Sequence, residues 1–441
     1  MSGKKLMDAR TTALNALIAT RRQGAWSDGI LKERIAKDGL DRRDAALASQ
    51  LAYGVMQNRL LLDHYLEQTV TRGLAKLQPV TQDILRLGAY QILFLDKIPD
   101  SAAVNQAVEQ TKRYVSERAA GLTNGALRAL VRGKNTLKAP KDLATKYSHP
   151  QALVELLREN LGDGELEAFL KADNEPVPTC LQVNTLLANA EQAEAAFTAL
   201  DIPFARHPWL PGCYLVKGTG DLAGLELFKN GQVYVQDPSA RLAAMAAGVK
   251  PGMDVLDVCA APGGKSFAAA IAMENRGSVT SCDIHEHKIS LIEKGAERLG
   301  IRILHAQQAD ASKFREDFEN RFDAVIADVP CSGLGVIRKK PDIRYKDLSP
   351  TERLPAVQAA ILENVSRYVK PGGVLVYSTC TILKRENEAV ALAFLKAHPD
   401  FSLEPFEVPE KLDAKNDGML TLLPHRHDAD GFFICRMRKN A

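Results

Sequence analysis

Apolar residues recur every three or four positions through the first third of the chain, as they do on the buried face of an α-helix. The pattern predicts four helices, over residues 9–23, 42–70, 79–98 and 102–117. Glycine and proline residues interrupt the pattern between these segments, and Pro79 stands where a helix tolerates proline best, at its first position. Because no alternating strand pattern intervenes, we predict an all-α domain over residues 1–146.

A different pattern begins after a polar stretch, residues 133–150, which is typical of a linker. Helical spacing returns over residues 152–162 and 189–200, and residues 179–186 predict a strand between them. Further short strands follow. We therefore predict a small α/β subdomain over residues 147–235.

From residue 251 onward, short apolar runs alternate with helical segments. The runs predict five strands, over residues 254–259, 278–284, 302–310, 322–329 and 372–379. Strands that are apolar at consecutive positions are buried on both faces, which happens when helices cover both sides of a parallel sheet. We therefore predict a doubly wound parallel sheet, a Rossmann-like α/β domain, over residues 236–441.

Length and composition fit this multidomain picture. The 441 residues exceed one ordinary core, and 46% hydrophobic with 25% charged residues is the balance of a soluble globular protein. Every apolar stretch is broken by charge well before the length of a membrane span, and the N-terminus lacks an apolar segment of signal-peptide length. We expect a cytoplasmic protein without membrane association.

The seven cysteines are odd in number, well separated in sequence and never arranged as C-x-x-C. This pattern fits neither a disulfide framework nor a zinc site. We therefore predict no bound metal, and we expect any chemically important cysteine to act as a thiol.

Charge is unevenly distributed, although the net charge is only +3. Residues 1–146 contain 24 lysines and arginines against 14 aspartates and glutamates, whereas residues 147–441 contain 33 against 40. A basic domain on an acidic body suggests that residues 1–146 bind a polyanion such as nucleic acid. From charge alone, a helical surface that is merely exposed to solvent and binds no nucleic acid is an equally good interpretation.

Candidate ligand-binding residues follow the predicted parallel strands, at the sheet edge where such folds bind ligands. In "VLDVCAAPGGKS", Gly263 and Gly264 allow the backbone to approach a ligand closely at a helix N-terminus. Asp283 ends the second strand, where a carboxylate can accept hydrogen bonds from ribose hydroxyls, and Asp310 after the third strand could reach an adenine amine. The loop lacks the glycine pattern of dinucleotide and nucleoside-triphosphate sites, which favours S-adenosylmethionine.

Cys331 and Cys380 follow the last two predicted strands. Carbon 5 of a pyrimidine becomes nucleophilic toward a methyl sulfonium once a thiolate adds to carbon 6. That reaction needs a thiol, an acid near N3, a methyl donor and a base that removes the carbon-5 proton. Asp328, two cysteines and an S-adenosylmethionine site together supply such groups, although either cysteine alone would more often be structural.

Seven ordered motifs resemble those of the RNA 5-methylcytosine methyltransferases: "GQVYVQDPSA", "DVCAAPGGKS", "CDIH", "DVPCSG", "RKKPDIR", "YSTC" and "DADGFF". The resemblance covers about residues 150–441. It implies that Cys380 is the nucleophile, that Cys331 assists product release and that Asp328 holds N3 of the target cytosine. It also implies a set of cofactor-binding residues: Cys259, Ala260, Ala261, Pro262, Gly263, Gly264, Lys265, Asp283, Asp310 and Asp328. For Lys265, contact with the methionine carboxylate and capping of the helix both stay open.

Three stretches of the helical domain, "LRLGAYQILFLDKIP", "VNQAVEQTK" and "LTNGALRAL", resemble the NusB family of RNA-binding domains. A NusB-like domain joined to an RNA 5-methylcytosine methyltransferase resembles the bacterial enzymes that methylate carbon 5 of cytosine 967 in 16S ribosomal RNA. The resemblance implies action on 16S ribosomal RNA, free or early in small-subunit assembly, through a covalent bond between Cys380 and carbon 6. We expect the protein to be a monomer.

Other functions stay open. The same chemistry could act on transfer RNA or 23S ribosomal RNA, or the chain could be a noncatalytic RNA-binding or antitermination factor. The joint presence of Cys331, Cys380, Asp328 and the glycine loop favours an enzyme. Cys331 also occupies the region where a DNA amino-methyltransferase would place an aromatic residue, which disfavours that class.

Overall fold

The computed structural model describes residues 8–23, 27–217 and 222–441. These residues form two compact units. The first unit comprises Met1–Asn174 together with Lys339–Lys346, and the second comprises Glu175–Arg338 and Asp347–Ala441. A short inserted segment, Lys339–Lys346, is therefore covalently part of the second unit's chain but folds with the first.

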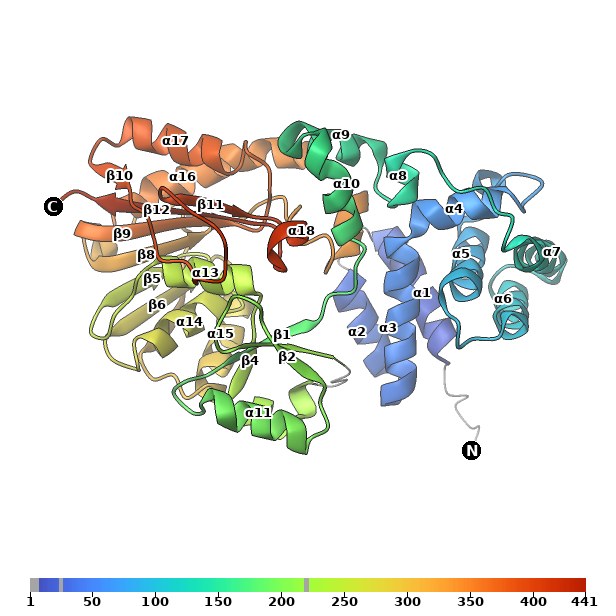
Figure 1. The fold of residues 1–441 in the computed structure, drawn as a ribbon, viewed down its shortest axis with the longest axis horizontal. Helices are drawn as coiled ribbons and strands as arrows, with labels where there is room; N and C mark the ends of the chain where they lie inside the picture. Colours follow the sequence, from blue (N-terminus) through green and yellow to red (C-terminus); the bar gives the residue numbers. More distant parts are fainter. Residues whose placement is uncertain (1–7, 24–26, 218–221) are drawn as a thin grey trace. The chain divides into compact units, whose positions relative to one another are not determined.

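The first unit is built from helices (Figure 1). They are α1 (Ala9–Gln23), α2 (Ser27–Asp38), α3 (Arg42–Gln57), α4 (Arg59–Glu67), α5 (Pro79–Phe94), α6 (Asp100–Tyr114), α7 (Glu117–Gly133), α8 (Leu143–Lys146), α9 (Gln151–Leu161) and α10 (Asp163–Ala172). Helix α5 is buried along most of its length and packs against α1, α3, α4, α6 and α7. Gly88 allows α7 to approach closely, because a Cβ there would lie 2.6 Å from Leu127 Cδ1.

The helix predictions for this unit need two corrections. The single helix predicted over residues 42–70 is two helices, α3 and α4, that meet at Asn58. Asn58 leaves the helical conformation, and its Nδ2 donates to the Gly54 carbonyl at 2.9 Å, which caps the end of α3. The pattern also missed α2, α7, α8 and α10; in α7, Gly121 and Gly125 weaken the helical signal.

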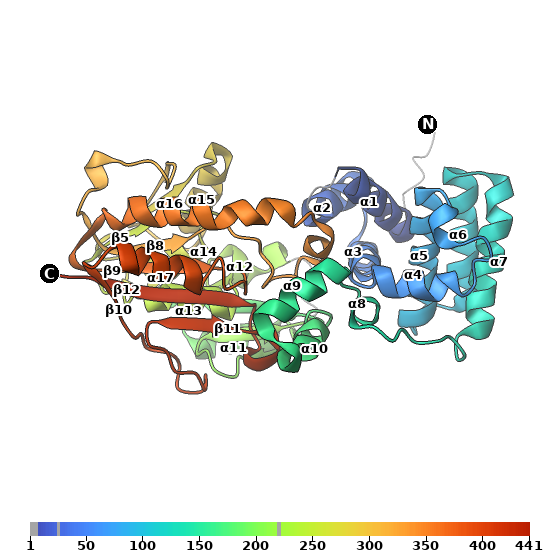
Figure 2. The same cartoon turned by 90° about the horizontal axis from the view of Figure 1, so that it is seen from above.

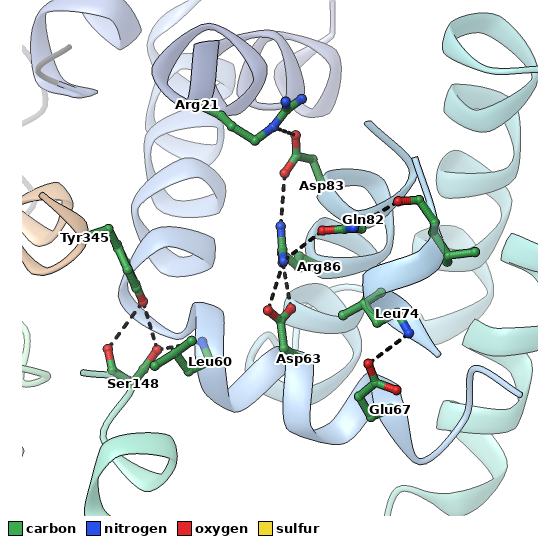
Figure 3. A network of polar contacts seen from close by, with 11 residues as sticks. Arg21, Leu60, Asp63, Glu67, Leu74, Gln82, Asp83, Arg86, Ser148 and Tyr345 are labelled. Carbon is green, nitrogen blue, oxygen red and sulfur yellow. Dashed lines mark hydrogen bonds and ion pairs between the residues drawn. The ribbon is translucent and has the colours of Figure 1, made fainter. Parts of the chain in front are cut away.

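A largely buried polar network ties α1, α4 and α5 together (Figure 3). Arg86 donates to Asp63 through Nε at 2.6 Å and Nη2 at 2.9 Å, and its Nη1 lies 3.2 Å from Asp83. Arg21 Nε donates to the second oxygen of Asp83 at 3.0 Å. Burial raises the pKa of Asp83, and the two arginines partly offset that rise. The buried guanidinium is tolerated because two carboxylates accept from it.

The inserted segment is anchored in the first unit by a buried arginine. It forms a short helical turn, η4 (Pro341–Tyr345), in which Arg344 is only 1% exposed. The Arg344 guanidinium donates to the backbone carbonyls of Gln57 at 2.9 Å and Asp173 at 2.8 Å. The segment therefore contributes hydrogen bonds that the helical unit needs to satisfy its own buried carbonyls.

The smaller sheet of the second unit is antiparallel, with strand order β2–β3–β1–β4. Its strands are β1 (Thr179–Val183), β2 (Phe204–Arg206), β3 (Cys213–Val216) and β4 (Val233–Val235). Helix α11 (Ala190–Ala199) packs its buried Phe197 against this sheet, and α12 (Glu226–Lys229) precedes β4.

The larger sheet has the strand order β10–β12–β9–β8–β5–β6–β7, with β11 paired to β12. Its strands are β5 (Asp254–Asp257), β6 (Ser278–Asp283), β7 (Leu304–Gln308), β8 (Phe322–Asp328), β9 (Val369–Thr379), β10 (Phe401–Leu403), β11 (Met419–Leu422) and β12 (Phe432–Lys439). Strands β5 to β9 are parallel, as predicted. The order reverses between β5 and β8, which is the switch point where such sheets bind ligands.

The five predicted strands are parallel, but the sheet continues into an antiparallel C-terminal part that the pattern did not predict, because β12 pairs antiparallel with β9, β10 and β11. The chain between β11 and β12 holds only the short helix α18 (Pro424–His427) and loops. Parallel strands need a crossover of a dozen or more residues, so this short connection permits only an antiparallel pair. The sheet is therefore mixed.

Helices cover both faces of the larger sheet (Figures 1 and 2). Helices α13 (Pro238–Ala246), α14 (Gly264–Ala272) and α15 (Glu286–Arg298) pack on one face, and α16 (Leu354–Ser366) and α17 (Glu388–Ala397) on the other. Consecutive residues of a strand pack on opposite faces of the sheet: Val255 belongs to the core under α13, α14 and α15, and Leu256 belongs to the core under α16 and α17. This double burial explains the unbroken apolar runs. Within the described ranges, no helix is long and apolar enough to cross a membrane.

Candidate functional site

The loop between β5 and α14 has the close backbone geometry expected of its glycines. Gly263 precedes the helix with φ +110°, a conformation that favours glycine. A Cβ at Gly263 would also lie 2.3 Å from the ring of Phe267. The loop is tied to the neighbouring strand end, because Ala260 N donates to the Cys282 carbonyl at 2.7 Å. The first two residues of α14, Gly264 and Lys265, line a cavity at the switch point.

A cavity of about 180 Å³ lies beneath this loop. Its walls come from the end of β4, the start of α13, the ends of β5 and β8, and the loop itself. The lining residues are Val235, Gln236, Ala240, Asp257, Cys259, Ala260, Ala261, Pro262, Gly264, Lys265 and Asp328. Seven of the predicted cofactor or catalytic residues thus share one cavity.

Lys265 and Asp328 form an ion pair at the edge of the cavity, with Nζ 2.6 Å from Oδ2. Ser378 Oγ donates to the other carboxylate oxygen of Asp328 at 2.9 Å. Burial lowers the pKa of Lys265, but Asp328 more than offsets this effect and leaves that pKa raised. The ammonium group is therefore a permanent positive charge beside the end of β8.

The two cysteines meet because their strands are neighbours. Strands β8 and β9 are parallel and in register at Asp328 and Ser378, so the residues that follow them emerge side by side. Cys331 Sγ lies 3.3 Å from Cys380 Sγ, and both residues are partly buried. Hydrogen bonding to Cys380, burial and nearby carboxylates raise the pKa of Cys331 well above its ordinary value. Cys331 is therefore a neutral thiol near pH 7.

A buried carboxylate holds the loop that carries Cys331. Glu386 is fully buried, and its Oε2 accepts from the Ser332 backbone N–H and from Gln358 Nε2, each at 2.9 Å. Gln358 Nε2 also donates to the Pro330 carbonyl at 3.0 Å. The peptide groups on both sides of Cys331 are thus fixed by one carboxylate and one amide.

The other two predicted carboxylates lie at neighbouring strand ends, outside the cavity's lining. Asp283 ends β6 and accepts from the His285 backbone N–H at 3.0 Å. Asp310 follows β7 and accepts from Ser312 N at 3.0 Å and Ser312 Oγ at 2.7 Å, and these bonds lower the pKa of Asp310. Both carboxylates share the carboxyl edge of the sheet with the loop, and both also cap local turns.

Comparison with known proteins identifies the family. The family described as 16S rRNA methyltransferase RsmB/F matches residues 244–438, the NusB family matches residues 7–132, and an RsmF/B-like ferredoxin-like domain matches residues 149–222. The Bacillus subtilis (strain 168) protein named "Probable ribosomal RNA small subunit methyltransferase B" is 41% identical over 99% of both chains. The chain belongs to the RsmB/F family of 16S rRNA methyltransferases.

Other relatives extend this result to the whole length of the RsmB/F-family chain. The Salmonella arizonae "Ribosomal RNA small subunit methyltransferase B" is 30% identical over 99% of this chain and 100% of its own. The crystal structure of PH0851 superposes with a TM-score of 0.82 at 26% identity, covering 98% of each chain. The protein is therefore an S-adenosylmethionine-dependent RNA methyltransferase, and the predicted family, enzyme class and fold class are confirmed.

Sequence reasoning missed two residues that the structure places at the site of this RsmB/F-family protein. Gln236 lies in the cavity within the "GQVYVQDPSA" motif, which the sequence offered only as a resemblance. Glu386 lies six residues after Cys380 in "LKRENEAV" and gave no chemical signal of its own. The local sequence does not show that a polar side chain will be buried at the site, so these two residues could be assigned to it only from the fold.

Proposed function

We propose that this protein methylates carbon 5 of one cytosine in 16S ribosomal RNA, cytosine 967, through a covalent bond between Cys380 and carbon 6. The observation that carries the proposal is the pair of thiols 3.3 Å apart beside the Lys265–Asp328 ion pair and the glycine loop. The names of the full-length relatives support small-subunit ribosomal RNA as the substrate.

S-adenosylmethionine, when bound, supplies an electrophilic methyl group on a sulfonium. The residues present fit it: the glycine loop leaves room for close approach, and buried polar atoms in the cavity lack partners among the described residues. Cys259 through Lys265 would hold it at the loop, with Asp283 toward the ribose and Asp310 toward the adenine. The His285 N–H and Lys288 Nζ both contact Asp283 Oδ1, at 3.0 and 3.5 Å, which leaves Oδ2 to accept from a ribose hydroxyl.

Cys380 and Asp328 activate the cytosine in this proposal. The thiolate sulfur of Cys380 adds to carbon 6, and the electrons of the carbon 5–carbon 6 double bond become available at carbon 5. The proton that the Cys380 thiol loses reaches N3 through the Asp328 carboxylate, which then accepts a hydrogen bond from the N3–H group and stabilises the ring as it takes up electron density. Lys265 and Ser378 fix both oxygens of that carboxylate, so its position is set before substrate arrives.

Cys331 acts at the end of the reaction. The carbon-5 proton must leave and the bond between Cys380 Sγ and carbon 6 must break to restore the aromatic ring. A base removes the carbon-5 proton, and the released electron pair forms the carbon 5–carbon 6 double bond as the bond to Cys380 Sγ breaks. The S–H group of Cys331 donates to the departing Cys380 thiolate, and the two sulfur atoms lie 3.3 Å apart in the structure.

Residues 1–146 serve as the RNA-binding domain in this proposal, and the chain works as a cytoplasmic monomer on 16S ribosomal RNA that is free or early in assembly. The match of residues 7–132 to the NusB family and the excess of basic residues support this assignment.

Bisulfite mapping tests the proposal. Purified protein with S-adenosylmethionine and a 16S transcript should protect cytosine 967 from deamination, and Cys380→Ala should not. Transcripts of transfer RNA and 23S ribosomal RNA serve as alternatives in the same experiment. Protection confined to one of those transcripts would replace the proposed substrate, and no protection in any of them would reject the proposed chemistry.

A further inference from the structure

Gln236 is a buried amide without a partner. It follows β4, and both of its backbone groups are engaged: its N–H donates to the Cys180 carbonyl, and its carbonyl accepts from Gln182 Nε2, each at 3.2 Å. The side chain is buried, at 6% residue exposure, and neither Oε1 nor Nε2 has a hydrogen-bond partner among the described residues. Buried polar groups are normally paired, so this amide points to a ligand.

The amide faces the cofactor loop. Gln236 Nε2 lies 3.3 Å from the position that a Cβ on Gly264 would take, which places it over the first residue of α14. A helix N-terminus presents free N–H groups and favours a negatively charged group. The small size of Gly264 is what leaves space between Gln236 and that helix end.

A second unpaired atom lines the same cavity. Asp257 is 1% exposed; its Oδ2 accepts from Ser266 Oγ at 2.7 Å, whereas its Oδ1 has no partner among the described residues. Gln236 and Asp257 come from different sheets, yet both lie in the lining of the cavity under the loop. The cavity thus offers an amide donor, an amide acceptor and a carboxylate oxygen, all unsatisfied.

The cavity fits one small polar end of a larger ligand. The volume of about 180 Å³ is below the roughly 300–1,000 Å³ of sites that enclose a whole ligand, so the cavity takes only one end of a larger molecule. An α-amino acid presents a carboxylate that accepts and an ammonium that donates. We propose that Gln236 binds the α-amino-acid end of the methyl donor, with Nε2 donating to its carboxylate while Asp257 Oδ1 accepts from its ammonium. This inference rests on the proposed use of S-adenosylmethionine at this site.

Two ligands that differ only in that end test the inference. S-adenosylhomocysteine carries the amino acid, and 5′-methylthioadenosine has the same nucleoside and thioether without it. Gln236→Met keeps the side-chain length and removes the hydrogen bonds. We expect Gln236→Met to raise the Kd of S-adenosylhomocysteine at least tenfold in calorimetry, the scale of a lost hydrogen bond to a charged group, and to leave the Kd of 5′-methylthioadenosine unchanged.

Matched variants separate the possible outcomes. Asp283→Ala, at the proposed ribose contact, should weaken both ligands, and Gln236→Asn, which withdraws the amide by one methylene, should repeat the selective loss if the methionine variant does not fold. Wild-type protein that binds neither ligand would count against the proposed function itself. The inference fails if Gln236→Met leaves the affinity for S-adenosylhomocysteine intact or lowers the affinity for both ligands equally. It also fails if the variant lowers only the affinity for RNA, since the amide would then contact the RNA base.

Discussion

Replacing Glu386 tests whether the position of Cys331 controls product release. Glu386 Oε2 accepts two N–H groups at 2.9 Å in a fully buried setting. Alanine would leave unpaired the Ser332 N–H and the one Gln358 N–H that Glu386 accepts, while the other Gln358 N–H keeps the Pro330 carbonyl. Each unpaired buried N–H costs about 1–3 kcal/mol, so roughly 2–6 kcal/mol would favour movement of the Cys331 loop. Even the lower figure shifts the balance between placed and displaced loop by a factor of about 30. We expect Glu386→Ala to slow turnover by at least that factor.

The assay is denaturing electrophoresis of reactions with substrate RNA and S-adenosylmethionine. Glu386→Ala should accumulate a protein–RNA band, because Cys380 bonds normally to carbon 6 but departs slowly. Glu386→Gln is the matched control, since its amide oxygen can accept the same two hydrogen bonds, and it should release RNA at close to the wild-type rate. Unchanged turnover in Glu386→Ala, with S-adenosylhomocysteine affinity retained, would refute the positioning role. Equal accumulation in both variants would show that the charge matters and the geometry does not.

Three further predictions concern the thiols, the RNA and the pH dependence. Cys331→Ala should accumulate the same covalent band and Cys380→Ala should form none; the opposite result would reverse the roles of the two thiols. Replacing the exposed Arg128 and Arg132 of α7 by glutamine should weaken RNA binding in filter assays and reduce the slope of log K against log salt by roughly 1.4–1.8, if each contacts one phosphate. Burial raises the pKa of Asp257 to about 6, so its carboxylate is protonated below that pH. S-adenosylhomocysteine, titrated by calorimetry, should therefore bind more tightly as pH rises from 5 to 7, whereas 5′-methylthioadenosine should show no such change.

The residues at the carboxyl edge of the larger sheet could be predicted from the sequence, because each of them follows a strand that its own local pattern predicts. Asp283, Asp310, Asp328 and Cys380 each end or follow a parallel strand, and parallel strands end at one edge. Once the alternation of strand and helix is recognised, these side chains are expected together. These residues are far apart in sequence, but the parallel sheet brings them close together in space.

Other features depend on partners distant in sequence and could not be predicted from local patterns. The Arg344 of "RKKPDIR" resembles a surface basic residue until the fold places it among the carbonyls of Gln57 and Asp173. This contact also changes an experiment that the sequence would suggest. Deleting residues 1–146 would remove one of these partners and expose the inserted segment, so substitution of surface arginines is the cleaner test of RNA binding.

Three of the sequence motifs meet at Arg338 in the second unit. Arg338 Nε lies 3.0 Å from Asp430 Oδ1, and its Nη2 lies 3.9 Å from Asp237, so "RKKPDIR", "DADGFF" and "GQVYVQDPSA" meet in one buried ion pair. Between this ion pair and Cys331, Gly335 N donates to the Cys380 carbonyl at 3.0 Å, and the Gly335 carbonyl accepts from Gly431 N at 2.8 Å.

That packing permits no side chain at Gly335, because a Cβ there would lie 1.9 Å from the Gly431 carbonyl oxygen. The stretch from Cys331 to Arg338 is therefore fixed near its start by Glu386, in its middle by the backbone of Cys380 and Gly431, and at its end by two carboxylates. In the proposed mechanism the Cys331 thiol meets the departing Cys380 sulfur at hydrogen-bond distance, and misplacement by about 1 Å is enough to slow an oriented reaction a hundredfold. We therefore expect the residues of these motifs to affect turnover through the position of Cys331.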